Sequence, residues 1–290
     1  MIGRLALLLA GLLWLTGCDA PAADDGRTWP EPAPALWHVS SSDGEAWLFG
    51  TVHALPDGLE WRTPAIENAL ARSDLLLVEI ANLDDGSAAT DAFEAISRAP
   101  PGLPPLIERI NPPERAAFSD ALAKADIKPD ALDDRKTWAA ALMLASALRE
   151  YDTANGVDRA LIAEAPQVMQ LEGFARQYRL FDSLSQPAQV ALLQSVLEEA
   201  GDEGQAQRLE AWLAGDIDRL EMLSNTSLLA NPELRRVLLT ERNAAWAARI
   251  TAAIRQGSRP FVAVGAGHML GAGGLPALLE ARGFTVERID

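Results

Sequence analysis

Apolar residues form short continuous runs near the start of the chain, and segments with helical spacing lie between them. Runs at 36–40 and 46–49, separated by a polar stretch that contains glycine, predict a β-hairpin. Thr63 before a proline predicts the start of a helix over 64–72. The apolar run over 74–79 predicts a buried strand, so this region has the strand, helix, strand order of a parallel sheet.

The pattern becomes mainly helical between about residues 91 and 223. Apolar residues there recur at helical spacing, as at Trp138 and Leu142. Residues 166–173 predict a short strand inside this region, with the carboxylate Glu172 at its end. Helix starts are indicated at 111–114, 129–130 and 185–187. We therefore expect a helical insertion at about 91–223.

The last part of the chain returns to alternating elements. A long helix is predicted over 232–255, followed by a strand over 261–264, a helix over 275–282 and a strand over 284–289. Together the patterns predict an α/β fold for residues 35–290. We expect a central mixed, largely parallel sheet that is flanked by helices and carries the helical insertion.

The first 17 residues predict an export signal. Arg4 precedes an apolar run that is shorter than the ~20 residues of a membrane-spanning helix. Residues 15–18, Leu-Thr-Gly-Cys, resemble a bacterial lipobox, in which the Cys18 thiol carries a diacylglycerol. The alternative is an ordinary cleaved signal with an incidental cysteine. Cys18 is the only cysteine, so the chain forms no internal disulfide.

Residues 18–34 predict a lipid anchor followed by a flexible tether rich in Ala, Pro, Asp and Gly. The full chain has a formal charge of −16, and removal of a signal that contains Arg4 leaves −17. Such acidity argues against nucleic acid as a partner, because phosphates would repel it. We expect an exported protein, anchored by lipid to the bacterial membrane and facing the periplasm.

Two of the three histidines occur in the same local frame. His53 and His268 each end a Gly-x-x-His sequence that follows an apolar, strand-like run. Ligands in α/β sheets bind outside the carboxyl ends of the strands, where both imidazoles would lie. Glu79 ends a further predicted strand, and histidine with carboxylate suits zinc or manganese. The alternative to a metal site is that these histidines are structural residues whose hydrogen bonds are made within the protein.

Several short motifs together resemble the TraB/PrgY/GumN family, which includes the Tiki proteins. The resemblance covers about residues 35–289. Its motifs are Gly50-x-x-His53 and the segments 77–79, 156–158, 171–172, 241–243, 262–268 and 283–288. Members such as Tiki are described as metal-dependent proteases that use the paired histidines, and PrgY as a factor that sequesters or inactivates a pheromone. The wider superfamily includes erythromycin-esterase-like and ChaN-like haem-binding proteins.

The resemblance implies roles for particular side chains. His53 and His268 would bind a divalent metal, and Glu79 would be a ligand or a general base. Arg242 and Asn243 would face the same crevice from a helix. Arg242 would stabilise a developing oxyanion, with a structural ion pair as the alternative.

Glu172 is a further candidate metal ligand, and the alternative is that it pairs with an arginine. The predicted function is metal-dependent hydrolysis by a Tiki-like metallopeptidase, with Mn, Zn or Co, of a peptide or protein outside the cytoplasm. The metal would lower the pKa of a bound water toward ~7, and a carboxylate would receive its proton. The alternative function is a non-catalytic protein that sequesters a peptide or cofactor.

Overall fold

The computed structural model describes residues 26–199 and 204–289, and it divides into two compact units. The sheet unit comprises the described residues of 22–81, 151–173 and 206–290. The helical unit comprises those of 82–150 and 174–205. The helices expected over 91–223 therefore belong to both units, because 151–173 and 206–223 are part of the sheet unit.

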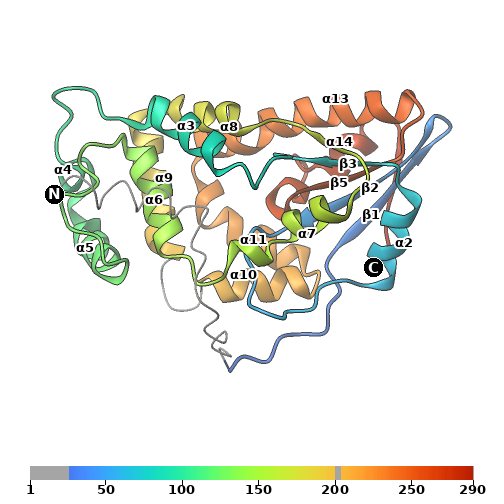
Figure 1. The fold of residues 1–290 in the computed structure, drawn as a ribbon, viewed down its shortest axis with the longest axis horizontal. Helices are drawn as coiled ribbons and strands as arrows, with labels where there is room; N and C mark the ends of the chain where they lie inside the picture. Colours follow the sequence, from blue (N-terminus) through green and yellow to red (C-terminus); the bar gives the residue numbers. More distant parts are fainter. Residues whose placement is uncertain (1–25, 200–203, 290) are drawn as a thin grey trace. The chain divides into compact units, whose positions relative to one another are not determined.

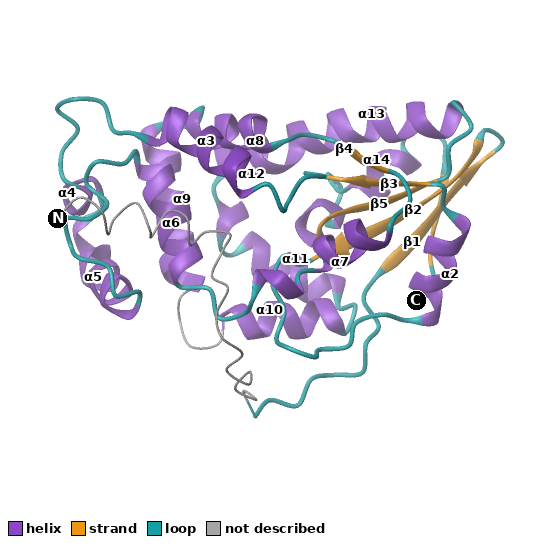
Figure 2. Cartoon of the chain, viewed as in Figure 1, coloured by secondary structure: helices purple, strands orange, loops and turns teal. Residues whose placement is uncertain are grey.

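In the described residues, six strands form one sheet in the order β4-β3-β5-β2-β1-β6. Figure 1 shows strands β1, β2, β3 and β5 of this sheet, and Figure 2 draws the strands in orange. The strands are β1 (Leu36–Ser41), β2 (Gly44–Thr51), β3 (Leu75–Val78), β4 (Val168–Gln170), β5 (Pro260–Gly265) and β6 (Thr285–Arg288). β5 pairs in parallel with β2 and β3, and β3 with β4. β1 is antiparallel to β2 and β6. The predicted α/β fold with a mixed, largely parallel sheet is confirmed.

Apolar side chains cover both faces of the central strands. Phe49 packs with Trp212 and Phe261 in one cluster, whereas its neighbour Leu48 packs with Trp246 in another. Successive side chains of a strand point to opposite faces, which explains the two clusters. Each fully buried large side chain contributes about 1.5–3 kcal/mol. The two-sided burial fixes where the strands end, and so where the residues that follow them lie.

Helices of the sheet unit cover these two faces (Figure 1). They are α2 (Pro64–Arg72), α7 (Val157–Glu164), α10 (Gly204–Leu213), α11 (Ile217–Asn225), α13 (Glu241–Arg255) and α14 (Leu275–Glu280). The short helix α12 (Pro232–Arg235) precedes α13 in the chain. Thr63 caps α2 by accepting a hydrogen bond from the Ile66 N–H at 3.3 Å, as its sequence predicts. The helix predicted over 232–255 is interrupted by a five-residue π-helical segment, Arg236–Thr240.

The helical unit is built around aromatic contacts. Trp138 lies 5.5 Å from Phe93 and 6.2 Å from Tyr178 between ring centroids. Its helices are α3 (Gly86–Ser97), α4 (Leu106–Arg109), α5 (Arg115–Lys124), α6 (Thr137–Ala147), α8 (Phe174–Asp182) and α9 (Gln186–Glu199).

The helix start predicted at 129–130 is wrong. Residues 129–134 form successive turns, and α6 begins only at Thr137. Asp133 Oδ1 accepts a hydrogen bond from the Leu106 N–H at 2.7 Å, and the Asp133 carbonyl accepts one from Arg109 at 2.8 Å. These hydrogen bonds anchor α4 against residues 129–134, which do not start a helix.

None of the helices in 26–199 and 204–289 is long and apolar enough to cross a membrane. The predicted signal (1–17) and the predicted lipidation site Cys18 lie outside the described residues.

Candidate functional site

Three of the predicted site residues follow parallel strands that end at the same edge of the sheet. Glu79 comes directly after β3, and His53 comes two residues after β2. His268 lies in a 3₁₀ turn, η5 (Ala266–Met269), directly after β5. Since β5 pairs with both β2 and β3, these three positions are neighbours at the carboxyl edge.

Gly265 marks the point at which the three side chains meet. A Cβ placed on Gly265 would lie 3.2 Å from Glu79 Oε1, 3.8 Å from His53 Nε2 and 3.9 Å from His268 Cδ2. The Gly265 N–H also donates to Glu79 Oε1 at 2.9 Å. The structure therefore brings His53, Glu79 and His268 together around a glycine, where a larger residue would fill the space between them.

His53 is held by a buried carboxylate. Its Nδ1 lies 2.7 Å from Asp158 Oδ2, and Thr51 Oγ1 donates to Asp158 Oδ1, also at 2.7 Å. The His53 side chain is 65% exposed, whereas that of Asp158 is 7% exposed. The imidazole therefore faces solvent while its anchor lies inside the protein.

His268 is held by a neutral amide. Asn243 Nδ2 donates to the carbonyls of Gly273 at 2.7 Å and His268 at 3.3 Å. This orientation leaves Asn243 Oδ1 to accept from His268 Nδ1, 2.5 Å away. Trp246 packs against the imidazole with ring centroids 4.4 Å apart. His268 is thus a buried imidazole whose Nδ1 carries the proton and whose Nε2 has the lone pair.

Arg242 joins the other site residues. Its Nη2 donates to Glu79 Oε2 at 2.5 Å, and its Nε lies 3.1 and 3.2 Å from the two Glu172 oxygens. Its Nη1 donates to the Leu238 carbonyl at 2.9 Å and to His268 Nε2 at 3.1 Å. Glu172 therefore pairs with an arginine in this structure, which is one of the two roles that the sequence allowed.

The π-helical segment just before α13 helps to orient Arg242. In this segment the Glu241 N–H bonds to the Arg236 carbonyl five residues earlier. The Leu238 carbonyl accepts from the Arg242 side chain. Short π-helical insertions are frequent at functional sites. The π-helical segment thus contains the carbonyl that anchors the guanidinium.

The charges of the site follow from these contacts. Burial opposes ionisation of Glu79, but His268, Arg242, His53 and the Gly265 N–H together favour the carboxylate and lower its pKa to about 2. Burial lowers the pKa of His268 to about 3, against the attraction of Glu79. Burial also disfavours the charged form of Arg242, but Glu79 and Glu172 outweigh it and raise its pKa. At neutral pH the site holds anionic Glu79, neutral His268 and cationic Arg242.

The side chains of His53, His268 and Glu79 are of the types that bind metal ions, although they are not arranged around a metal position in this structure. Among the described residues, no group of three His, Cys, Asp or Glu side chains is placed to hold a metal ion. The guanidinium of Arg242 contacts both Glu79 and His268 Nε2. Two imidazoles and a carboxylate suit zinc, manganese or cobalt, and each imidazole has its Nδ1 tied to an oxygen, as metal ligands have. The residues fit a divalent metal if Arg242 releases His268 Nε2.

The comparison with protein families shows to which family the chain belongs. The model of the TraB/PrgY/gumN family matches residues 35–288. The chain belongs to this family. Comparisons with curated proteins and with solved structures give no match. The region that matches the TraB/PrgY/gumN family contains both Gly-x-x-His turns, Glu79, Glu172 and Arg242.

Sequence reasoning placed Asn243, the partner of His268, at the site of this family member, but it missed the partner of His53. Residues 156–158 are one of the motifs that carry the family resemblance, but the sequence predicts no role for Asp158, Thr51 or Trp246. Asp158 lies more than 100 positions from His53, so no local spacing joins them. The available signal was the Gly-Val-Asp sequence at 156–158, within the mainly helical region predicted at about 91–223.

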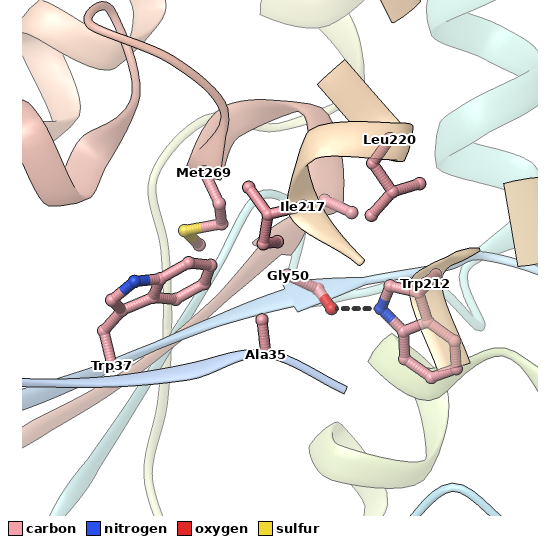
Figure 3. A pocket seen from close by; sticks show the side chains of 8 residues that line it. Ala35, Trp37, Gly50, Trp212, Ile217, Leu220 and Met269 are labelled. Carbon is pink, nitrogen blue, oxygen red and sulfur yellow. Dashed lines mark hydrogen bonds between the residues drawn. The ribbon is translucent and has the colours of Figure 1, made fainter. Parts of the chain in front are cut away.

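A small apolar pocket lies beneath the two turns (Figure 3). Trp212 Nε1 donates to the Gly50 carbonyl at 2.7 Å along its wall. The pocket is lined by Ala35, Trp37, Gly50, Trp212, Ile217, Leu220, Ala266 and Met269. Its volume of about 10 Å³ holds about one water molecule. We therefore place no substrate there, and regard it as packing that supports the turns.

Proposed function

We propose that this TraB/PrgY/gumN family member is a metal-dependent hydrolase, a Tiki-like metallopeptidase that acts on a peptide or protein outside the cytoplasm. One observation carries the proposal. The Nε2 of His53 and the Oε1 of Glu79 approach the same point at Gly265, and the ring of His268 approaches it as well. Two imidazoles and one carboxylate form a three-ligand set of the kind that leaves a position for water in catalytic sites.

The balance of buried charge supports a cation at this place. The buried side chains described in the sheet unit include the carboxylates Glu79, Asp158 and Glu172, but one permanent cation, Arg242. With neutral imidazoles this group has an excess of negative charge. Buried charges are costly unless they are paired, so a divalent ion such as Mn, Zn or Co would be stabilised here.

The mechanism assigns separate tasks to the residues of the chain. A bound metal would lower the pKa of a coordinated water toward ~7. Glu79 suits the role of ligand better than that of base, because a carboxylate with a pKa near 2 is a weak proton acceptor. Arg242 would donate its N–H groups to the substrate oxygen on which negative charge develops. Asn243 would hold His268 with its Nε2 toward the site.

The alternative is a protein that sequesters a peptide or cofactor without turnover. One observation favours it: the Arg242 guanidinium already pairs with Glu79 and Glu172 and contacts His268. A site satisfied in this way needs no metal for its stability.

Metal-dependent cleavage of a mixed peptide library, followed by mass spectrometry, tests the proposal. We expect cleavage by protein loaded with Mn, Zn or Co, loss of cleavage with chelator, and loss in the His53→Ala variant. The control is His38→Ala, because His38 pairs with Glu45 in the β1–β2 hairpin, away from the site. Absence of cleavage with all three metals, despite metal binding, favours the sequestering protein.

We also propose that the protein is exported and anchored to the membrane by lipid on Cys18. The support is the sequence Leu15-Thr16-Gly17-Cys18 after a short apolar run. The Cys18→Ala variant should leave the membrane fraction or remain unprocessed. An unmodified mature N-terminus, together with unchanged membrane fractionation of the variant, would contradict the anchor.

A further inference from the structure

We propose that Asp158, supported by Thr51, is a positioning residue that fixes His53 in the Nδ1-protonated tautomer and presents Nε2 to the site. This inference rests on the proposed function for its purpose, which is to prepare His53 for a metal. The state of the imidazole is nevertheless a property of the protein alone.

The start of α7 is built against the His53 turn. The Val157 N–H donates to the Val52 carbonyl at 3.0 Å. A Cβ on Gly156 would lie 2.5 Å from the His53 carbonyl oxygen, closer than real Cβ atoms approach. Glycine at 156 therefore lets the helix begin in contact with the turn. This close approach places Asp158, in the first turn of α7, beside the imidazole of His53.

The two oxygens of Asp158 have separate donors. Oδ1 accepts from the Thr51 hydroxyl, and Oδ2 lies 2.7 Å from His53 Nδ1. Thr51 and His53 are two positions apart on the same segment, so one carboxylate holds both ends of the turn. Because Thr51 and Asp158 are buried, this arrangement has little freedom to rotate. Thr51 thus fixes the carboxylate, and the carboxylate fixes the imidazole.

The chemistry of the carboxylate decides the tautomer. An ionised carboxylate only accepts hydrogen bonds, so the neutral imidazole that bonds to it must carry its proton on Nδ1. The lone pair then lies on Nε2, the atom that approaches the Gly265 position. Metal-binding histidines commonly have such carboxylate partners, and removal of the partner typically lowers metal affinity 10–100-fold.

His38 provides a matched comparison within the same sheet. It also pairs with a carboxylate, but its Nε2 contacts Glu45 Oε2, at 2.8 Å. The same argument assigns the opposite tautomer, with the proton on Nε2, to neutral His38. Since the chain has three histidines, its imidazole ¹⁵N spectrum contains three side-chain systems that can be assigned by single substitutions.

The test is the imidazole ¹⁵N spectrum of the purified protein without metal at about pH 9, above the ordinary histidine pKa of ~6.5. We expect His53 in the Nδ1–H form and His38 in the Nε2–H form. Asp158→Ala should shift His53 toward the Nε2–H form and leave His38 unchanged. The control Glu45→Ala should affect His38 alone.

Calorimetric titration with manganese, zinc and cobalt completes the test. We expect Asp158→Ala to weaken the binding ~10–100-fold, and Glu45→Ala to leave it unchanged. Wild-type His53 in the Nε2–H form overturns the inference, and this measurement needs no folded variant. An Asp158→Ala variant that keeps both the Nδ1–H form and full affinity also overturns it. If the wild type binds none of the metals, the proposed function fails, while the wild-type tautomer still decides the role of Asp158.

Discussion

The two Gly-x-x-His turns share a sequence frame but place their histidines in opposite surroundings. His53 is 65% exposed and is anchored by the anionic Asp158. His268 is 7% exposed, is anchored by the neutral Asn243 and contacts the cationic Arg242. In both turns an oxygen acceptor holds Nδ1, so the feature that the turns share is an Nε2 directed toward the site.

This difference in surroundings predicts different roles for the two turns. The His268 turn is a buried structure in which Arg242 connects two carboxylates and an imidazole. The His53 turn faces solvent, so the metal ion or substrate of the proposed hydrolase would reach His53 first. Changes at the His268 turn should therefore alter stability as well as chemistry, whereas changes at the His53 turn should act mainly on binding.

Removal of the cation from the His268 turn should have the largest effect. Arg242→Met removes the buried cation that pairs with Glu79 and Glu172, and we expect a loss of about 3–5 kcal/mol in the free energy of unfolding. Arg255→Met is the matched control, because Arg255 lies on the same helix but pairs with Asp43 at the exposed surface. Its loss should be about 0–1 kcal/mol. Urea denaturation measures both losses, and equal losses would contradict a stabilising role of the buried cation at the His268 turn.

A conservative change at the same position separates chemistry from stability. Lysine keeps the charge of Arg242 but lacks the planar fork of donors, so Arg242→Lys should lower turnover by roughly 10²–10³. Metal content should stay near that of the wild type, because a guanidinium does not ligate cations. Peptide cleavage and elemental analysis of one preparation check both expectations. A variant that unfolds, or loses metal as fully as His53→Ala, would show that Arg242 is structural.

The sequence was sufficient to predict the strands and the site residues at their ends, but not the contacts that orient the side chains of these residues. Buried parallel strands are continuous apolar runs, so the positions of His53, Glu79 and His268 at one edge follow from local patterns. The Asp158 contact depends on how α7 docks, which no local pattern encodes. The π-helical segment before Arg242 is hidden in an ordinary helical pattern. Tertiary packing determines both the docking of α7 and the π-helical winding before Arg242.

Acid should weaken the His268 turn in metal-free protein. The pKa values of His268 and Glu79, about 3 and about 2, lie below their ordinary values of 6.5 and 4.5. Between pH 6.5 and pH 2 the unfolded chain therefore binds more protons than the folded protein does. The stability that is present above pH 6.5 is lost as the pH falls over this range.

His268→Gln should reduce this loss between about pH 6.5 and pH 3, because one of the two groups is removed. His38→Gln, the control in the hairpin, should keep the wild-type slope. Urea denaturation at a series of pH values, in chelator, measures the slopes. An unchanged slope in His268→Gln would mean that another group causes the acid sensitivity.

The central claim is that the two turns serve one divalent metal, and metal stoichiometry tests it most directly. Protein purified without chelator and loaded with manganese, zinc or cobalt should carry one ion per chain by elemental analysis. His53→Ala and His268→Ala should each abolish this binding, the double variant should be no worse, and His38→Ala should keep it. Circular dichroism establishes that the variants are folded. Folded single variants with full metal occupancy, or a wild type that carries no metal, would contradict the account.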